Sequence, residues 1–195
     1  MTIAELILQE TAALGPFPWS GGTIHRVDAA TAAHEAEEIA KAYDAWGTEV
    51  CLQCAIIRKE GRFDPNALDP NLQHAPGANA LLHIGGKWPD QHTADQHSDF
   101  GIAQVNGDSS YMGPDAIGRS LEFLCRKVNA DIQFFALRGY PIEVALHAYN
   151  TGRHGAQMLY DQELAAGGAW AALHAMDYGR GVMANYHEYV KLGVV

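Results

Sequence analysis

The sequence predicts a mainly α fold, with a small extended or β region between about residues 64 and 108. Apolar residues recur at three- and four-residue spacing along most of the chain, as amphipathic helices require, and strand patterns are few. A chain of 195 residues with 48% apolar residues can bury one core of ordinary size. We expect residues 1–45 to form an N-terminal helical extension packed on a domain of residues 46–195.

The N-terminal part of the chain predicts two helices joined by a loop. Residues 3–14 carry an amphipathic pattern, and Thr2 before them is a suitable N-cap. Residues 15–27 are rich in proline and glycine and predict the loop. From Asp28, another good N-cap, an Ala-rich and charged stretch runs to about Trp46. Its wide polar face indicates a helix on the outside of the domain.

A buried helix is predicted next, from about Thr48 to Glu60. The apolar run that begins at Val50 leaves no wide polar face, which is typical of a helix inside a domain. Gly61 and Pro65 are expected to stop the helix. A single acidic side chain, Glu60, therefore lies where a core helix reaches the surface.

Two interpretations of Glu60 follow from this position. Its carboxylate shares a face with Ile56 and Ile57, because residues three and four apart are neighbours on a helix. Burial there would favour the protonated carboxyl, the form that a general acid needs near neutral pH. A solvated glutamate at a helix end is the other interpretation, and the pattern alone leaves both open.

The apolar residues in the middle of the chain show no lasting period. Residues 64–98 are irregular, and so long an irregular segment in a compact domain is usually functional. Residues 80–84 predict either a short strand or one helical turn. Residues 99–107 predict a short element whose glycine, Gly101, allows a close approach of the backbone.

The C-terminal part of the chain predicts further helices separated by glycines. Pro114 opens a long helix that ends at Gly139. A helix over residues 141–149 follows, and Asn150-Thr151-Gly152 terminates it. The remaining helices are predicted at about residues 155–166, 168–176 and 181–192.

Charge and cysteine content exclude several classes of function. The chain has 13 Lys and Arg against 23 Asp and Glu, a formal charge of −10, which argues against nucleic acid as the main partner. No apolar stretch predicts a membrane span. Cys51 and Cys54 fall in the buried helix pattern and, with Cys125, predict small buried hydrophobes rather than a disulfide or zinc site. The ten histidines show no metal-binding spacing. We expect no metal and no cofactor.

Three segments in this order resemble one family. Residues 55–67 (AIIRKEGRFDPNA) resemble the catalytic-glutamate segment of soluble lytic transglycosylases and the related goose-type lysozymes. Residues 100–106 (FGIAQVN) resemble their Gly-Leu-Met-Gln segment, and residues 145–152 (ALHAYNTG) their Ala-Tyr-Asn-x-Gly segment. The resemblance extends from about residue 46 to residue 192. It implies that residues 46–195 form a lysozyme-like catalytic domain with a groove for the glycan strand of peptidoglycan.

The resemblance also implies roles for individual residues. Glu60 would be the general acid that protonates the β-1,4 glycosidic oxygen between N-acetylmuramic acid and N-acetylglucosamine. Gln104 would bind sugar near the cleavage point, and Gly101 would let the backbone approach it. Tyr149 would lie close enough to Glu60 to hydrogen-bond its carboxyl or to hold the sugar. The substrate-binding candidates are Gly101, Gln104, Asn106, Tyr149, Asn150 and Tyr186. Turn, core and helix-cap roles remain alternatives for Gln104, Tyr149 and Asn150.

The sequence departs from the family pattern in four ways. Gly61 replaces the serine that often follows the glutamate, and Ala103 replaces the methionine of Gly-Leu-Met-Gln. The segment of residues 71–98 is much longer than the usual link. The acidic charge is unusual for an enzyme that acts on an anionic cell wall.

The outcome of the reaction depends on a second acid. Asp95 or Asp99 could supply the first of the two aspartates of goose-type lysozymes, but Asn106 occupies the place of the second. A transglycosylase manages with one glutamate because the substrate's own groups complete the reaction, so the sequence favours transglycosylation and leaves hydrolysis open. A third alternative, from another class, is an inactive lysozyme-fold module that binds glycan or forms a structural part of a virion.

The N-terminus lacks the basic region of a signal peptide. We therefore expect a protein that is made in the cytoplasm and acts on the cell wall after release or export, through phage lysis, a virion or a secretion system. We also expect a monomer. An endolysin and an exported effector both fit this expectation.

Overall fold

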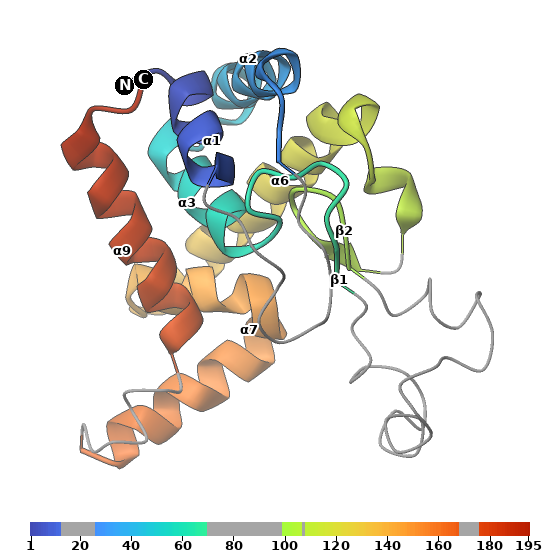
Figure 1. The fold of residues 1–195 in the computed structure, drawn as a ribbon. Coiled ribbons are helices and arrows are strands. Elements are labelled where there is room, and N and C mark those ends of the chain that lie inside the picture. The colour runs from blue at the N-terminus through green and yellow to red at the C-terminus, as the bar shows by residue number, and fades with distance from the viewer. Residues whose placement is uncertain (13–25, 70–98, 107, 168–175) are drawn as a thin grey trace.

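The computed structural model describes residues 1–12, 26–69, 99–106, 108–167 and 176–195. In these ranges the chain is mainly helical, so the predicted fold class is confirmed at that level. The α-helices are α1 (Ile3–Ala12), α2 (Ala29–Trp46), α3 (Val50–Lys59), α6 (Ile117–Ala136), α7 (Ile142–Ala165) and α9 (Asp177–Leu192), as Figure 1 shows. Two short 3₁₀ helices, η1 (Ser109–Tyr111) and η2 (Pro114–Ala116), precede α6.

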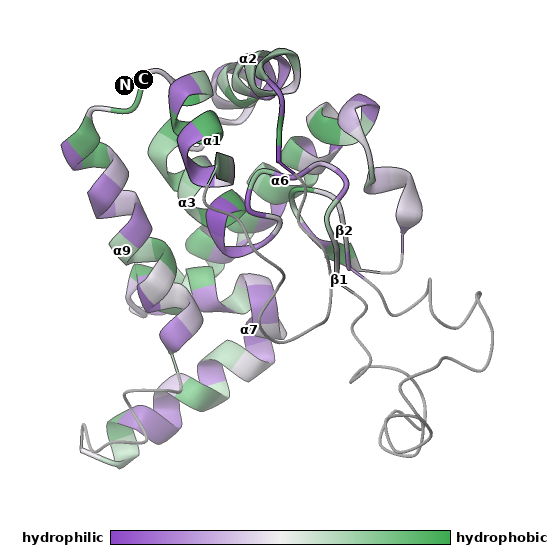
Figure 2. Cartoon of the chain, in the orientation of Figure 1, coloured by the Kyte–Doolittle hydropathy of each residue, from purple (hydrophilic) through white to green (hydrophobic). Residues whose placement is uncertain are grey.

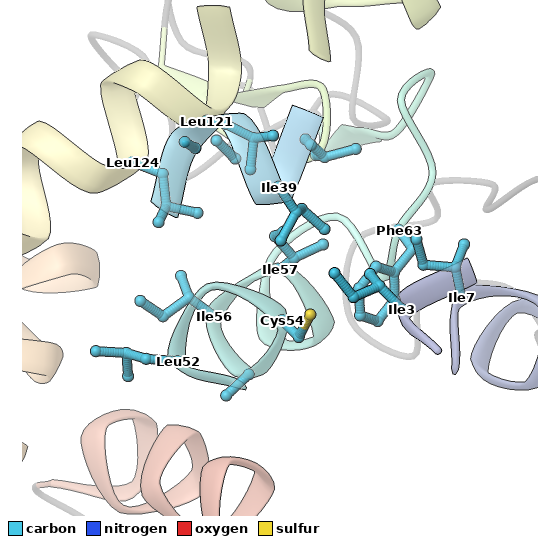
Figure 3. Close-up of a cluster of buried hydrophobic side chains, with 14 of the residues drawn as sticks. Ile3, Ile7, Ile39, Leu52, Cys54, Ile56, Ile57, Phe63, Leu121 and Leu124 are labelled. Atoms are coloured by element: carbon cyan, nitrogen blue, oxygen red, sulfur yellow. The ribbon is translucent and has the colours of Figure 1, made fainter. Parts of the chain in front are cut away.

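Helix α3 lies at the centre of the core, as its apolar run predicts. Every residue from Leu52 to Ile57 is buried. The helix packs against α9 on one side and contacts α2 and α6 on the other. Figure 3 shows Ile57 of α3 pointing toward Ile39 of α2, and both side chains are fully buried. Each such burial contributes about 1.5–3 kcal/mol of hydrophobic stabilisation, which fixes the end of α3 where Glu60 follows.

Both predicted N-caps are present. Thr2 and Glu5 form a reciprocal capping box at the start of α1, because the Glu5 amide donates to Thr2 Oγ1 over 3.2 Å and the Thr2 amide donates to Glu5 Oε2 over 2.8 Å. At the start of α2, Asp28 Oδ1 accepts a hydrogen bond of 2.7 Å from the Thr31 amide. Local sequence therefore sets the beginning of each helix.

The first 45 residues contribute directly to the main core. Ile3 and Ile7 of α1 and Ile39 of α2 belong to the same buried cluster as the residues of α3. Helix α2 packs against both α6 and α1. The boundary near residue 45 stays a prediction.

The extended region consists of three strands of two residues each in the described part of the chain. β1 (Leu68–Asp69) pairs antiparallel with β2 (Asp99–Phe100), which pairs antiparallel with β3 (Val105–Asn106). All three fall between residues 64 and 108. The hairpin of β2 and β3 puts Asp99 opposite Asn106. The long loop of residues 71–98 and its apolar cluster at 80–84 lie outside the described residues.

The helices after residue 114 differ from the prediction in two places. The break predicted at Asn150-Thr151-Gly152 is a kink at Gly152 (φ 72°, ψ 165°), and α7 continues beyond it. The predicted start of the last helix at residue 181 is wrong, because α9 begins at Asp177 and runs through Gly179 and Gly181. Neither glycine ends the helix, and Gly179 permits close packing on the backbone of α7. The predicted helix at 168–176 lies almost entirely outside the described residues.

Hydrophobic and hydrophilic residues alternate along α9 in Figure 2, as expected of a helix with one buried face. Val182 and Tyr189 are its fully buried side chains. Among the cysteines, Cys54 and Cys125 are buried and Cys51 is partly buried, and all three are free thiols. Of the described helices, none has the length and apolar character needed to cross a membrane.

Candidate active site

Glu60 lies at the C-cap of α3 and is partly buried. Its amide still donates to the carbonyl of Ile56 over 2.9 Å, and the backbone then leaves the helix. Arg62 and Phe63 both have positive φ, of 47° and 63°, a conformation that side chains other than glycine seldom adopt. Phe63 is completely buried and holds this turn in place. The core therefore fixes the backbone on both sides of Glu60.

Tyr178 is a hydrogen-bond partner of the Glu60 carboxyl. Its hydroxyl donates a hydrogen bond to Glu60 Oε1, and the two residues come from α9 and the end of α3. Burial and the charge of Glu60 raise the pKa of Tyr178 well above its usual value, so this phenol keeps its proton. The sequence prediction missed Tyr178 because it began the last helix at residue 181. The signal available in the sequence was the pair Tyr178-Gly179, because a glycine within a helix can mark a close contact with another helix.

His147 packs against Tyr178. The two rings meet edge to face, with their centroids 6.2 Å apart. His147 is buried, and within the described part of the chain neither ring nitrogen has a hydrogen-bond partner. Burial lowers its pKa; the charge of Arg180 also lowers it, and that of Asp177 opposes them. A neutral imidazole therefore supports the ring that holds Glu60.

Gly61 joins the Glu60 turn to the hairpin of β2 and β3. A Cβ at this position would lie 2.7 Å from the Cα of Ile102 and 2.8 Å from the carbonyl oxygen of Gly101. Both of these atoms belong to the backbone and cannot move aside as a side chain would. Serine would therefore not fit where this chain has Gly61, and the departure from the family pattern has a packing cause. The close contact sets Glu60 beside the Gly101 segment.

Gly101 also makes a close contact, but with the chain itself. Its φ is 71°, and a Cβ there would lie 2.1 Å from the carbonyl oxygen of Tyr111. The same carbonyl accepts a hydrogen bond of 3.2 Å from Ser120 Oγ. The glycine is thus needed for the packing of the hairpin on the segment before α6. The approach of its backbone to a sugar stays a prediction.

Gln104 holds the hairpin turn. Its backbone has a φ of 48°, and its side-chain amide donates to the carbonyl oxygens of Gly101 over 2.7 Å and Ala67 over 3.3 Å. Its Oε1 atom is buried and has no hydrogen-bond partner among the residues that the structure describes. The amide group therefore has a structural role, and a contact between Gln104 and sugar stays a prediction.

Tyr149 reaches the same hairpin from α7. Its hydroxyl donates to the carbonyl oxygen of Ala103 over 2.8 Å, so the hydrogen bond expected toward Glu60 is made instead by Tyr178. Lys127 lies over the Tyr149 ring at 5.1 Å from the centroid. Burial raises the pKa of Tyr149, and the charges of Glu60 and Asp99 raise it further. Both carboxylates therefore act on the same phenol.

The other predicted residues are distributed unevenly. Asp99 begins the hairpin, Asn106 ends it, and Asn150 is exposed on α7 beside Tyr149. Tyr186 lies elsewhere: its hydroxyl donates over 2.6 Å to Glu49, at the opposite end of α3 from Glu60. Ten helical residues separate the two ends by about 15 Å. Asp95 lies outside the described residues.

The candidate site thus combines the carboxyl of Glu60 with two partly buried tyrosines and a second carboxyl, that of Asp99. Glu60 and Tyr178 are in direct contact, and Tyr149 and Asp99 are close enough for electrostatic coupling. Within the described ranges, no group of three or more His, Cys, Asp or Glu side chains could hold a metal ion.

Comparison with models of protein families, with curated proteins and with solved structures gives no match for this chain.

Proposed function

We propose that this protein cleaves the glycan strands of peptidoglycan at the β-1,4 bond between N-acetylmuramic acid and N-acetylglucosamine, with Glu60 as the general acid. The proposal includes a lysozyme-like domain over residues 46–195. One observation carries it. Three segments that the resemblance selected, and that lie far apart in the sequence, meet at Glu60: Gly61 packs on Ile102, and Tyr149 donates to Ala103.

The arrangement around Glu60 suits proton donation to a glycosidic oxygen. Tyr178 donates to Oε1 of Glu60 and so helps to orient the carboxyl that would give up the proton. When the bond between the sugar C1 and the leaving oxygen breaks, Glu60 gives up this proton. In transglycosylation the C6 hydroxyl of the same sugar then bonds to C1, and its proton returns to Glu60. The product is a 1,6-anhydro sugar, and no water is consumed.

Transglycosylation is the favoured outcome because it needs one acid only. The place after Gln104 where goose-type lysozymes have an aspartate holds Asn106 in this chain. An amide cannot act as a base toward water. The substrate must then supply the nucleophile, as in a transglycosylase.

Hydrolysis is the second candidate, and Asp99 is the observation in its favour. Asp99 begins the hairpin that packs on Gly61, and its charge, like that of Glu60, raises the pKa of Tyr149. An inverting hydrolase needs a carboxylate of this kind to activate water on the far face of the sugar.

Clearing of a cell-wall suspension tests the general acid. We expect the unmodified protein to clear purified peptidoglycan and Glu60→Gln to lose at least about a hundredfold in rate, since general acid catalysis contributes about 10²–10⁴-fold. Glu122→Gln is the matched control, because Glu122 is exposed on α6 and pairs only with Arg126 among the described residues. Equal clearing by the Glu60 and Glu122 variants would rule out Glu60 as the acid.

Mass spectrometry of the released fragments separates the two reactions. Anhydro ends would identify a transglycosylase, and reducing ends a hydrolase. Asp99→Asn should leave the first reaction nearly intact and abolish the second.

An inactive module is the alternative of another class, and it is motivated by Gly61, the long 71–98 segment and the acidic charge. Binding of peptidoglycan without any product, even at high protein concentration, would support this alternative. For the active enzyme we propose synthesis in the cytoplasm and action on the wall after release or export.

A further inference from the structure

A second concave site lies at the N-terminal end of α3, at the opposite end of this helix from Glu60. It is a pocket of about 230 Å³ between α3, α6, α7 and α9. Its apolar wall consists of Leu52, Ile132, Ile142 and Met183. Pockets for drug-sized ligands have volumes of roughly 300–1,000 Å³, so this one suits a smaller group.

Most polar groups at the rim of this pocket are already paired. Thr48 Oγ1 donates to Asn129 Oδ1 over 3.1 Å, and Asn129 Nδ2 donates to the carbonyl oxygen of Trp46 over 2.9 Å. The Tyr186 hydroxyl donates to Glu49 Oε2 over 2.6 Å. These side-chain donors are therefore engaged within the protein, and a ligand that needs a side-chain donor would have to displace one of these bonds.

Glu49 is the charged group at the rim. It occupies the N-cap position of α3, yet its side chain makes no capping hydrogen bond to the first turn of that helix. Tyr186 turns the carboxylate toward α9 instead, where it lies at the edge of the apolar wall. No lysine or arginine is among the residues that line the pocket. The pocket therefore offers an acceptor with negative charge beside an apolar surface.

We propose that this pocket binds a primary alkylammonium group. The aliphatic stem would lie on Leu52, Ile132 and Met183, and the ammonium would donate to Glu49. Charged amines bury their methylene groups in this way and keep the charged end at a polar rim. The ligand is either a small free amine or a lysine side chain on a peptide. The site is separate from Glu60, and this inference does not depend on the proposed glycan cleavage.

Binding of three six-carbon probes tests the charge preference. Titrations with n-hexylammonium, n-hexanol and n-hexanoate, followed by NMR, should show the order hexylammonium, then hexanol, then hexanoate. Glu49→Gln keeps an oxygen acceptor for Tyr186 and removes the charge. It should weaken hexylammonium binding about fivefold, which corresponds to the upper end of the contribution of an exposed ion pair. The affinity for hexanol should not change. Glu122→Gln, on the exposed face of α6, is the control and should change neither.

A second variant tests the apolar wall. Ile142 is 40% exposed, so Ile142→Ser should fold normally and weaken hexylammonium and hexanol by the same factor. Equal binding of hexylammonium by the unmodified protein and by Glu49→Gln, or the absence of binding of hexylammonium to the unmodified protein, would overturn the proposal.

The source of the amine is decided by two further probes. Cadaverine represents free amines, and an N-acetylated, C-amidated Gly-Lys-Gly peptide represents lysine side chains. Tighter binding of either one, weakened about fivefold in Glu49→Gln, supports the site and identifies its source. Binding of neither would contradict the proposal.

Discussion

Glu60 illustrates how much one residue depends on its neighbours. Its place at the end of a buried helix follows from the apolar run of α3, which the sequence displays directly. Its hydrogen bond to Tyr178 does not follow from the local sequence, because the two residues are separated by 118 positions. The bond contributes to the orientation of the carboxyl.

The first prediction concerns this bond. Tyr178→Phe should lower kcat for glycan cleavage about tenfold, the effect of losing one hydrogen bond to a charged group, and leave KM nearly unchanged. The ring remains, so its contact with His147 and the fold should persist. The rate of release of soluble fragments measures the effect. Tyr43→Phe, on the exposed face of α2, is the control, and a Tyr178→Phe protein as active as this control would contradict the prediction.

The glycines of the site could be recognised as special from the sequence, but not their partners. Gly101 was predicted to allow a close approach, and the structure shows the approaching atom to be the Tyr111 carbonyl oxygen. Gly61 raised doubt about activity when compared with the family serine. Its contact with Ile102 gives the reason for glycine, since no Cβ fits there.

At the scale of elements, the register of α9 on α7 positions Tyr178. Gly179 lies against the first turn of α7, and a Cβ there would be 2.1 Å from the Glu143 carbonyl oxygen and 3.1 Å from the His147 amide nitrogen. Both are backbone atoms, so any side chain would push the helices apart. For the next glycine, Gly181, the three atoms nearest to an added Cβ all belong to the flexible side chain of Lys59.

The second prediction compares these two glycines. Gly179→Ala should lower the free energy of unfolding by about 1–3 kcal/mol, the cost of overpacking, and should also reduce glycan cleavage because Tyr178 moves. Gly181→Ala should leave stability unchanged or raise it by up to about 1 kcal/mol, since alanine favours the helix. Urea unfolding measures both. Equal stability of the two variants would show that Gly179 does not set the helix contact.

The kink of α7 is supported by an ion-pair network. Gly152 leaves the helical conformation, and Lys127 donates to the Ala148 carbonyl oxygen over 3.0 Å just before it. Asp131, which is buried, holds both Lys127 and Arg153. The sequence predicted the break from Asn150-Thr151-Gly152, but the partners that stabilise it come from α6.

At the scale of the whole molecule, a buried acid links stability to pH. Glu35 of α2 is completely buried, and within the described residues neither of its carboxylate oxygens has a hydrogen-bond partner. Burial raises its pKa well above the ordinary value of 4.5, and the charge of Asp64 raises it further. The folded chain therefore keeps a proton that the unfolded chain releases.

The third prediction follows from that difference. The contribution of Glu35 to stability is complete below pH 4.5 and is lost as the pH rises toward the raised pKa of the folded state. Glu35→Met should remove this pH dependence and raise the free energy of unfolding at neutral pH by about 1–3 kcal/mol, because it removes unpaired buried oxygens. Urea unfolding at several pH values measures it.

Glu37→Gln is the control for this prediction. Glu37 is exposed on the same helix, and its hydrogen bond to Lys41 lowers its pKa, so its removal cannot reproduce the effect. If the unmodified protein and Glu35→Met lose stability in parallel as the pH rises, Glu35 is not the group responsible.

The sequence by itself determined the helical class, the caps at Thr2 and Asp28, the burial of α3 and the position of Glu60 at its end. These features depend on local spacing, which a single segment carries. The tertiary structure decided that Tyr178 rather than Tyr149 bonds Glu60, and that Tyr186 lies at the other end of α3. These outcomes depend on how α9 packs against α3 and α7, and such contacts between distant segments leave no periodic signal in the chain.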